Sequence, residues 1–289
     1  MTGSVGRVEA GDHSDLDIFC VDVATDDAKR IGKLDSIQIL SDLIKANQAG
    51  RFPPFSGDGR FLDVHNVEDV LPFLGTRDDD YRNLFTARML LLLESQVLVG
   101  EGPYKEAVER VIDLYMRDCS DEKTFKPTFL LNDLVRYWRT LCLAHEANDH
   151  IQQERTLDER HQRRVSVLKL QFNRVWMVFN GLAYLLSGFQ DEGVPRTHIE
   201  RLVDLTPLGR ALEIAERFPE GRRQLQTLLN EYAWFLEVTD RPKCQVETFF
   251  AEDAHYREGR ERGAIFGDHM AELVNHVAAA TPIQRHLLI

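Results

Sequence analysis

The stretch that decides the first part of the fold is GSVGRVEAGDHSDLDIFCVDV, residues 3–23. Its second half is rich in β-forming residues, and its apolar and polar side chains alternate. This period of two predicts a strand over residues 15–23, with Asp15 and Asp17 on one face and Ile18 on the other. The sequence therefore predicts a strand that carries two carboxylates close together, although an ordinary solvent-exposed strand face would give the same pattern.

A glycine-serine pair comes shortly before this strand. Gly3 would allow backbone N–H groups to approach a phosphate, and the hydroxyl of Ser4 would add a hydrogen-bond donor. Arg7 follows, and its guanidinium group would pair with a phosphate oxygen, or alternatively would cap or salt-bridge the turn. Gly3, Ser4 and Arg7 thus form the predicted nucleotide-binding turn.

Two carboxylates on one strand face suit hard divalent cations, which prefer oxygen ligands. We expect Asp15 and Asp17 to hold two Mg²⁺ ions, with Mn²⁺ as a possible substitute, beside the triphosphate of a nucleotide. Such a site needs a third carboxylate, and Asp63 is the leading candidate because it lies in the next strand-like segment, RFLDVH, residues 60–65. Asp63 would bind one ion and accept the proton of the incoming hydroxyl as general base.

Two other aspartates are weaker candidates for the third ligand. Asp58 lies in a glycine-flanked turn, where aspartate is common for local hydrogen bonding. Asp22 should point away from Asp15 and Asp17, because its position differs from theirs by an odd number along the strand.

The remainder of the chain changes character. A helical spacing of apolar residues covers residues 34–49 and ends at Gly50. After about residue 78 strand signals almost vanish and helical patterns follow one another. We therefore predict an α+β protein with a small α/β head over residues 1–76 and a larger all-helical body over residues 77–289.

Composition limits the possible functions. The 289 residues carry 35 Lys and Arg against 47 Asp and Glu, so a formal net charge of −12 argues against broad binding of nucleic acid. The four cysteines form no CxxC pair, which favours a reducing, cytoplasmic location. The most apolar stretch, residues 175–189, is shorter than the roughly 20 residues that span a bilayer and is interpreted as a buried helix without membrane contact.

The string G-S-x-G-R-x-E followed by S-D-L-D, with a later aspartate, resembles the signature of the DNA polymerase β superfamily of nucleotidyltransferases. It is similar to the nucleotidyltransferase segments of PII uridylyltransferases and related bacterial regulatory enzymes. The resemblance covers about the first 75 residues. It implies Mg²⁺-dependent transfer of a nucleoside monophosphate from an NTP, such as ATP, to a hydroxyl group. The acidic balance favours a protein or small-molecule acceptor over nucleic acid.

The sequence departs from that superfamily at one point. The resemblance implies a β-strand before the Gly-Ser turn, where this sequence has only Met1 and Thr2. The expected head therefore lacks its first strand, and we expect the natural chain to start further upstream. The missing strand keeps a second interpretation open, in which the protein is a catalytically inactive sensor or interaction protein with the same fold.

The helical body offers weaker candidates. Asn132, Arg136 and Arg139 lie on one helical face. We predict that they lie around the site without binding the metal ions directly. Arg139 and His145 also fit the R-x(4-6)-H spacing of HEPN ribonucleases, a third functional alternative. Trp138 and Trp176 are interpreted as core residues.

Overall fold

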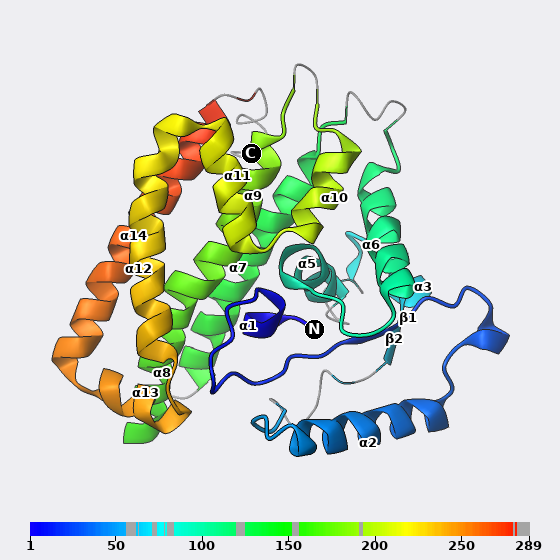
Figure 1. Cartoon of the computed structure of the whole chain (residues 1–289), viewed down its shortest axis with the longest axis horizontal. Coiled ribbons are helices and arrows are strands. Elements are labelled where there is room, and N and C mark those ends of the chain that lie inside the picture. Colours follow the sequence, from blue (N-terminus) through cyan, green and yellow to red (C-terminus); the bar gives the residue numbers. More distant parts are fainter. Residues whose placement is uncertain are drawn as a thin grey trace. The chain divides into compact units, whose positions relative to one another are not determined.

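The computed structural model describes residues 1–55, 62, 64–70, 74–77, 79, 84–119, 125–151, 156–190, 193–279 and 281 (Figure 1). The chain divides into two compact units. Unit 1 comprises Met1–Ser120 and Ile199–Thr206, and unit 2 comprises Asp121–His198 and Pro207–Ile289. Unit 1 therefore extends well past residue 76, where the sequence patterns had suggested a boundary between head and body.

Unit 1 contains a small parallel sheet. Strand β1 (Cys20–Asp22) pairs with β2 (Val64–Asn66), and Cys20 lies opposite Val64 in the register. Parallel strands need a long crossover connection, and here that connection contains helix α2 (Lys33–Ala49). Both predicted strands exist. Strand β1 has three residues, fewer than the pattern of residues 15–23 suggested, and β2 begins within the predicted stretch 60–65, of which residues 60, 61 and 63 lie outside the described residues.

The helices described in unit 1 are α1 (Gly3–Gly6), the short 3₁₀ turn η1 (Asp27–Lys29), α2, α3 (Val67–Val70), α5 (Leu84–Glu94), α6 (Glu101–Met116) and most of α10 (Arg196–Asp204). The core of the unit lies along α5, where Phe85, Met89 and Leu93 are almost completely buried. Helix α6 contacts both α5 and β1, so it joins the sheet to the core of the unit.

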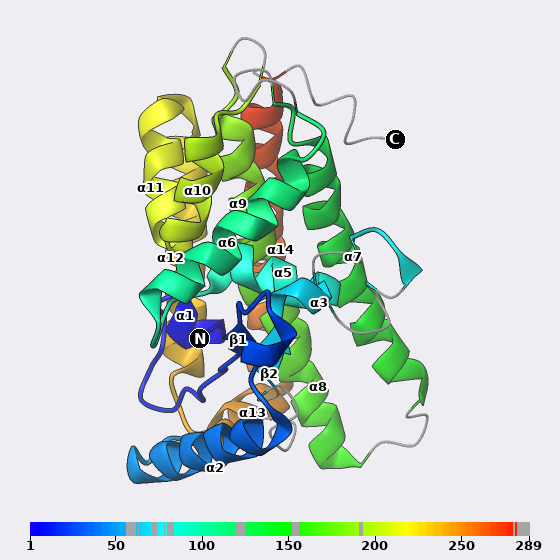
Figure 2. The ribbon, with the colours of Figure 1, turned by 90° about the vertical axis from the view of Figure 1, so that its right-hand side faces the viewer.

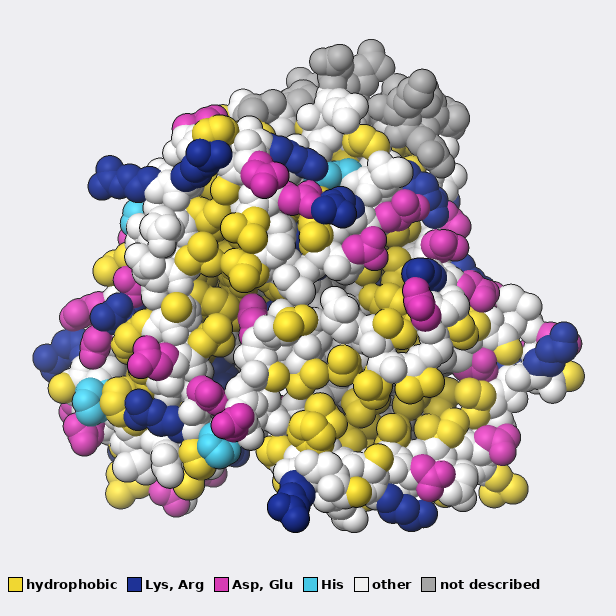
Figure 3. Space-filling view, in the orientation of Figure 1, with side chains coloured by type: hydrophobic (Ala, Val, Ile, Leu, Met, Phe, Trp, Pro, Cys, Tyr) yellow, Lys and Arg dark blue, Asp and Glu magenta, His cyan; other side chains and the backbone are white. Residues whose placement is uncertain are grey.

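Helix α2 is the most exposed helix of unit 1 among the described residues. Its Leu34 and Ile37 side chains are 81% and 54% exposed, although both are apolar. In Figures 1 and 2 the helix runs beside the sheet as a separate rod. Figure 3 shows hydrophobic side chains gathered over the part of unit 1 that contains α2 and the strands. The periodicity of residues 34–49 thus predicted the helix correctly, but not that its apolar residues would face solvent.

Unit 2 is a bundle of helices (Figures 1 and 2). Its elements are α7 (Thr128–Ile151), α8 (Leu157–Lys169), the π-helical turn η5 (Leu170–Arg174), α9 (Val175–Ser187), α11 (Pro207–Arg217), the 3₁₀ turn η6 (Pro219–Gly221), α12 (Arg222–Thr239), α13 (Lys243–Ala251) and α14 (Asp253–Ala279). Helix α9 lies at its centre, in contact with α7, α11 and α14. The prediction that residues 175–189 form a buried helix is confirmed.

An aromatic cluster fills the centre of this bundle. Phe172 stacks on Phe235 with ring centroids 4.6 Å apart, and Trp176, Tyr232 and Phe266 surround them. Such pairs add about 0.5–1.5 kcal/mol each beyond the burial of their area. Trp176 is therefore a core residue, as expected.

Fold class follows from these elements. The described chain is mostly helical with one two-stranded parallel sheet, which confirms an α+β protein with a helical body. No helix within the described ranges is both long enough and apolar enough to cross a membrane. Whether the first unit is a nucleotidyltransferase head stays a prediction.

Candidate functional site

The Gly-Ser turn forms the short helix α1. Gly3 has a φ of +67°, a left-handed conformation that glycine adopts without strain. The helix is closed by two hydrogen bonds, from the N–H of Gly6 to the carbonyl of Thr2 (3.1 Å) and from the N–H of Arg7 to that of Gly3 (3.0 Å). Ser4 is partly exposed at the first turn. The turn expected from the sequence is therefore present, and it places Gly3 in the conformation that only glycine accepts easily.

Asp17 lies against this turn. The N–H of Thr2 donates to the carbonyl of Asp17 at 2.8 Å, and the two residues form an isolated antiparallel bridge. The Asp17 carboxylate is so close to Gly3 that a β-carbon at position 3 would lie 2.3 Å from Oδ2. The structure thus brings together the glycine of the predicted nucleotide-binding turn and one of the predicted metal ligands.

Asp15 and Asp63 are less well defined by the structure. Asp15 is partly buried in the extended segment that leads into the bridge. Asp63 and Asp58 lie outside the described residues, so their roles stay predictions. Asp63 directly precedes Val64, which pairs with Cys20 on β1. Among the residues that are described, no three His, Cys, Asp or Glu side chains lie close enough together to hold a metal ion.

Arg7 makes buried ion pairs. Its Nε donates to Oε2 of Glu9 at 2.6 Å, and its Nη1 donates to Glu94 at the end of α5. The side chains of Arg7 and Glu94 are only 4% and 2% exposed. Of the two alternatives that the sequence offered for Arg7, the structure shows the salt bridge, because two carboxylates already occupy its guanidinium group. A direct contact from Arg7 to a phosphate stays a prediction.

The end of α5 also holds the start of the chain. The amino group of Met1 donates to the carbonyl of Gln96, and the N–H of Gln96 donates to the carbonyl of Met1, both at 2.8 Å. Burial lowers the pKa of this amino group below its ordinary value. Together with the Arg7–Glu94 pair, these bonds fix α1 against α5.

Asp22 has a structural role at the end of β1. Its carboxylate accepts hydrogen bonds from the N–H groups of Ala24 (2.9 Å) and Ile31 (3.0 Å) and from the amide of Asn66 (3.1 Å). Burial alone would raise the pKa of Asp22, but these hydrogen bonds and the nearby Arg30 hold it below its ordinary value. These hydrogen bonds connect the end of β1 to β2 and to the loop that follows β1. The carboxylate therefore has a structural role, in agreement with its position as a weaker candidate for a metal ligand.

The polar candidates of the helical body all belong to α7, within unit 2. Asn132 and Arg139 are exposed, and Arg136 is partly buried and forms an ion pair with Asp133 at 3.5 Å. Trp138 packs edge-on against Phe179 with centroids 5.3 Å apart, a contact inside the bundle. The supporting role of Asn132, Arg136 and Arg139 stays a prediction, since they are in a different unit from Asp17.

The third functional alternative concerns the same helix. Arg139 is exposed, and His145 lines a cavity within unit 2. Both residues lie on α7, so the spacing that suggested a ribonuclease falls within one continuous helix. A catalytic role for this pair stays a prediction.

The sequence did not predict the roles of Glu9 and Glu94 as partners of Arg7. Glu9 is separated from Arg7 by one residue, and this spacing is itself a signal, because it allows a local ion pair. Glu94 ends the apolar run LFTARMLLLLE, and a single carboxylate on so apolar a helix is a signal for a buried partner. Its distance along the chain, 87 residues from Arg7, hid the identity of that partner.

The sequence matches no protein-family model, no curated protein and no solved structure. The resemblance to the polymerase β superfamily therefore rests on the residues of this chain alone.

Proposed function

We propose that this protein is a nucleotidyltransferase that moves a nucleoside monophosphate from an NTP to a hydroxyl group. The observation that carries the proposal is the close approach of the Asp17 carboxylate to Gly3. A metal ligand and a phosphate-binding turn must be neighbours in such an enzyme, because a divalent ion held by Asp17 would neutralise the charge of the phosphates that the turn binds.

The donor set fits a hard divalent cation. Asp15 and Asp17 supply carboxylate oxygens, the ligands that Mg²⁺ prefers, and Asp63 is the proposed third carboxylate. Bound Mg²⁺ would neutralise the charge that develops on the phosphate oxygens during transfer. The residues of the chain would do the rest: the turn at Gly3 and Ser4 would position the phosphates, and Asp63 would take the proton of the acceptor hydroxyl.

The acceptor is proposed to be a protein or a small molecule. With a net charge of −12, the protein as a whole repels the phosphate backbone of nucleic acids. The NTP substrate is itself an anion, so its binding depends on the metal ions and on the backbone N–H groups of the turn.

The test is transfer of label from each radiolabelled NTP in the presence of Mg²⁺ and cell extract. Asp15→Asn/Asp17→Asn should abolish the transfer without lowering the melting temperature, because the substitutions relieve repulsion between two carboxylates. Asp63→Asn should abolish transfer as well. The matched control is Asp35→Asn, which removes an exposed aspartate of α2 and should transfer at the wild-type rate. Equal labelling by wild type and by the double variant would refute the proposal.

A second candidate is a nucleotide-binding protein without catalytic activity. The ion pairs of Arg7 with Glu9 and Glu94 favour it, because they engage the arginine that was expected to contact the phosphate. Calorimetry decides between the two candidates. Mg²⁺-dependent NTP binding that is lost in Asp15→Asn/Asp17→Asn, with no transfer to any fraction of the extract, would support the non-catalytic candidate.

A further inference from the structure

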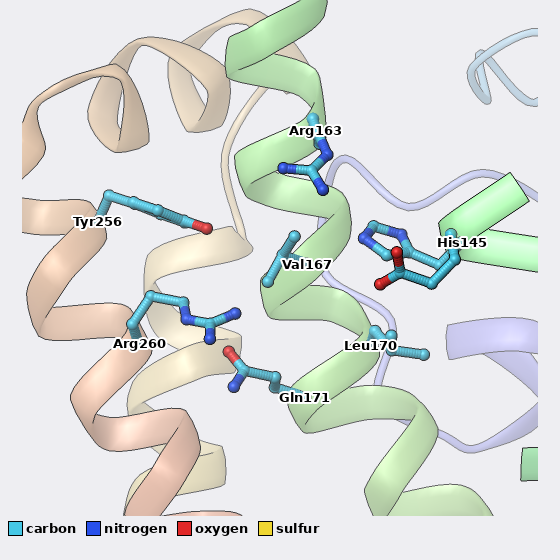
Figure 4. A pocket seen from close by; sticks show the side chains of 8 residues that line it. His145, Arg163, Val167, Leu170, Gln171, Tyr256 and Arg260 are labelled. Carbon is cyan, nitrogen blue, oxygen red and sulfur yellow. The ribbon is translucent and has the colours of Figure 1, made fainter. Parts of the chain in front are cut away.

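Unit 2 contains a cavity of about 430 Å³ between α7, α8, η5 and α14 (Figure 4). Its lining consists of His145, Glu146, Arg163, Val167, Leu170, Gln171, Tyr256 and Arg260. The volume falls within the range of about 300–1,000 Å³ that is usual for small-molecule sites. Its lining is mostly polar, with Val167 and Leu170 as the apolar side chains, so a polar or charged ligand suits it better than an apolar one.

Two arginines give the cavity its charge. Figure 4 shows Arg260 extending from α14 toward α8 and Gln171, and Arg163 lying on the face of α8. Within the part of the chain that the structure describes, Arg260 has no ion-pair partner, and its side chain is exposed. Glu146 is the only carboxylate in the lining, so the arginines leave a net positive charge on a protein whose total is −12. Guanidinium groups are well suited to bind phosphate oxygens in pairs.

Gln171 supplies a second, independent observation. Its Oε1 is buried and accepts no hydrogen bond from any described group. Leaving a buried acceptor without a donor is costly, so such an oxygen indicates a missing partner. Gln171 lies in the π-helical turn η5, between α8 and α9. π-helical turns of this kind inside α-helices are frequent at functional sites.

From these observations we propose that the cavity binds a small organic phosphate that carries hydroxyl groups, of the size of a sugar phosphate or a nucleoside monophosphate. The phosphate contacts Arg163 and Arg260. The hydroxyl groups donate to Oε1 of Gln171 and to the carboxylate of Glu146. Val167, Leu170 and the ring of Tyr256 exclude water from the rest of the molecule. The proposal concerns unit 2 and holds whether or not the N-terminal aspartates catalyse transfer.

The test is calorimetry on the full chain, with ribose 5-phosphate and adenosine monophosphate as probes and ribose and inorganic phosphate as references. EDTA is included, so that a metal-dependent site at Asp15 and Asp17 does not contribute. Saturable binding of either organic phosphate, about tenfold or more tighter than that of both references, is the expected result. Absence of binding by both organic phosphates overturns the proposal, and so does equal affinity for inorganic phosphate.

Substitutions of two arginines on α14 test whether the ligand binds in this cavity. Arg260→Gln should weaken binding at least about tenfold, because a charge-assisted contact to the phosphate is lost. Arg257→Gln is the matched control, since Arg257 is an exposed arginine on the same helix that does not line the cavity, and its affinity should stay within about twofold. Equal effects of the two substitutions would place the binding elsewhere.

Gln171→Met separates a binding role from a structural one. The change removes the buried oxygen, so the ligand-free protein should melt at the same or a higher temperature while binding weakens. A variant that binds the probe as tightly as wild type overturns the role of Gln171. Asp15→Asn/Asp17→Asn should bind both organic phosphates like wild type, which makes a failure of the transferase proposal distinguishable from a failure of this one.

Discussion

The carboxylate of Asp17 occupies the space that any side chain at position 3 would need, since a β-carbon there would lie 2.3 Å from its Oδ2. Gly3 also has a positive φ, so two independent constraints require glycine at this position. A side chain at position 3 would therefore displace the carboxylate of Asp17. A nucleotide bound at the Gly-Ser turn, as proposed above, would lie beside the Asp17 carboxylate.

Gly3→Ala is the first prediction. The left-handed conformation costs an L-residue roughly 1–2 kcal/mol, and the clash with Asp17 adds to that cost. We expect the free energy of unfolding to fall by about 1–3 kcal/mol and NTP binding to be lost, as measured by urea denaturation and calorimetry.

Gly102→Ala is the control for this substitution. Gly102 lies in α6 with a negative φ and nothing within 4 Å of its added β-carbon, so alanine should stabilise the protein by about 0.4–1 kcal/mol. A Gly3→Ala variant as stable as wild type would show that Asp17 and the turn rearrange easily.

The buried pair of Arg7 and Glu94 gives a second prediction. Arg7→Met leaves the carboxylates of Glu9 and Glu94 close together without a cation, and removing one partner of a buried ion pair costs about 3–5 kcal/mol. Chemical denaturation should show a loss of that size. The double variant Arg7→Met/Glu94→Gln should recover part of it, because the buried negative charge of Glu94 is also gone.

An exposed pair serves as the comparison. Lys105 and Glu101 form an i, i+4 ion pair on the surface of α6, and Lys105→Met should change stability far less than Arg7→Met. If Arg7→Met had an equally small effect on stability but removed NTP binding, Arg7 would be a phosphate ligand instead of a structural residue.

The depressed pKa of Asp22 predicts a pH dependence. Its folded pKa lies below the ordinary value of 3.8, so its stabilising contribution is complete above that value. The contribution disappears as the pH falls through the lower folded value. Asp22→Asn should therefore be less stable than wild type at pH 7, and the difference should shrink as the pH is lowered below about 4. Urea denaturation at several pH values measures it, and a difference that does not change with pH would contradict the assignment.

Local patterns were enough to find most of the helices. A capping box of Thr156 and Glu159 begins α8, and Gly188 ends α9. Both signals consist of residues within one turn of the helix end, so a local pattern is enough to detect them. The length of the first strand was overestimated, because alternation marks residues suited to a strand while the ladder needs a partner.

The candidate site was harder to predict. The sequence motif grouped Gly3 with Asp17, and the structure shows them in contact. The motif did not reveal that Arg7 pairs with Glu94 or that Asn66 donates to Asp22. The members of these two pairs are 87 and 44 residues apart in the chain. Contacts of that kind depend on tertiary packing, which leaves no periodic trace in a sequence.

The last prediction concerns Gly188, which ends α9 beside the buried ring of His198. This ring stacks on Tyr184 with centroids 4.4 Å apart and hydrogen-bonds to the carbonyl of Tyr184 at 2.8 Å, so it has little freedom to move. A β-carbon at position 188 would lie 2.0 Å from Cδ2 of His198. Gly188→Ala should therefore cost about 1–3 kcal/mol through overpacking, measured by chemical denaturation.

Two further variants identify the cause of that loss. Gly267→Ala places a methyl group on α14 where nothing lies within 4 Å, and it should raise stability by about 0.4–1 kcal/mol. His198→Ala removes the ring that the new methyl group at position 188 would strike, at the cost of its hydrogen bonds and stacking. If the clash is the cause, the double variant Gly188→Ala/His198→Ala loses less stability than the two single losses combined, because the methyl group then enters the space of the missing ring. Strictly additive losses would instead locate the effect of Gly188→Ala in the backbone of the helix end.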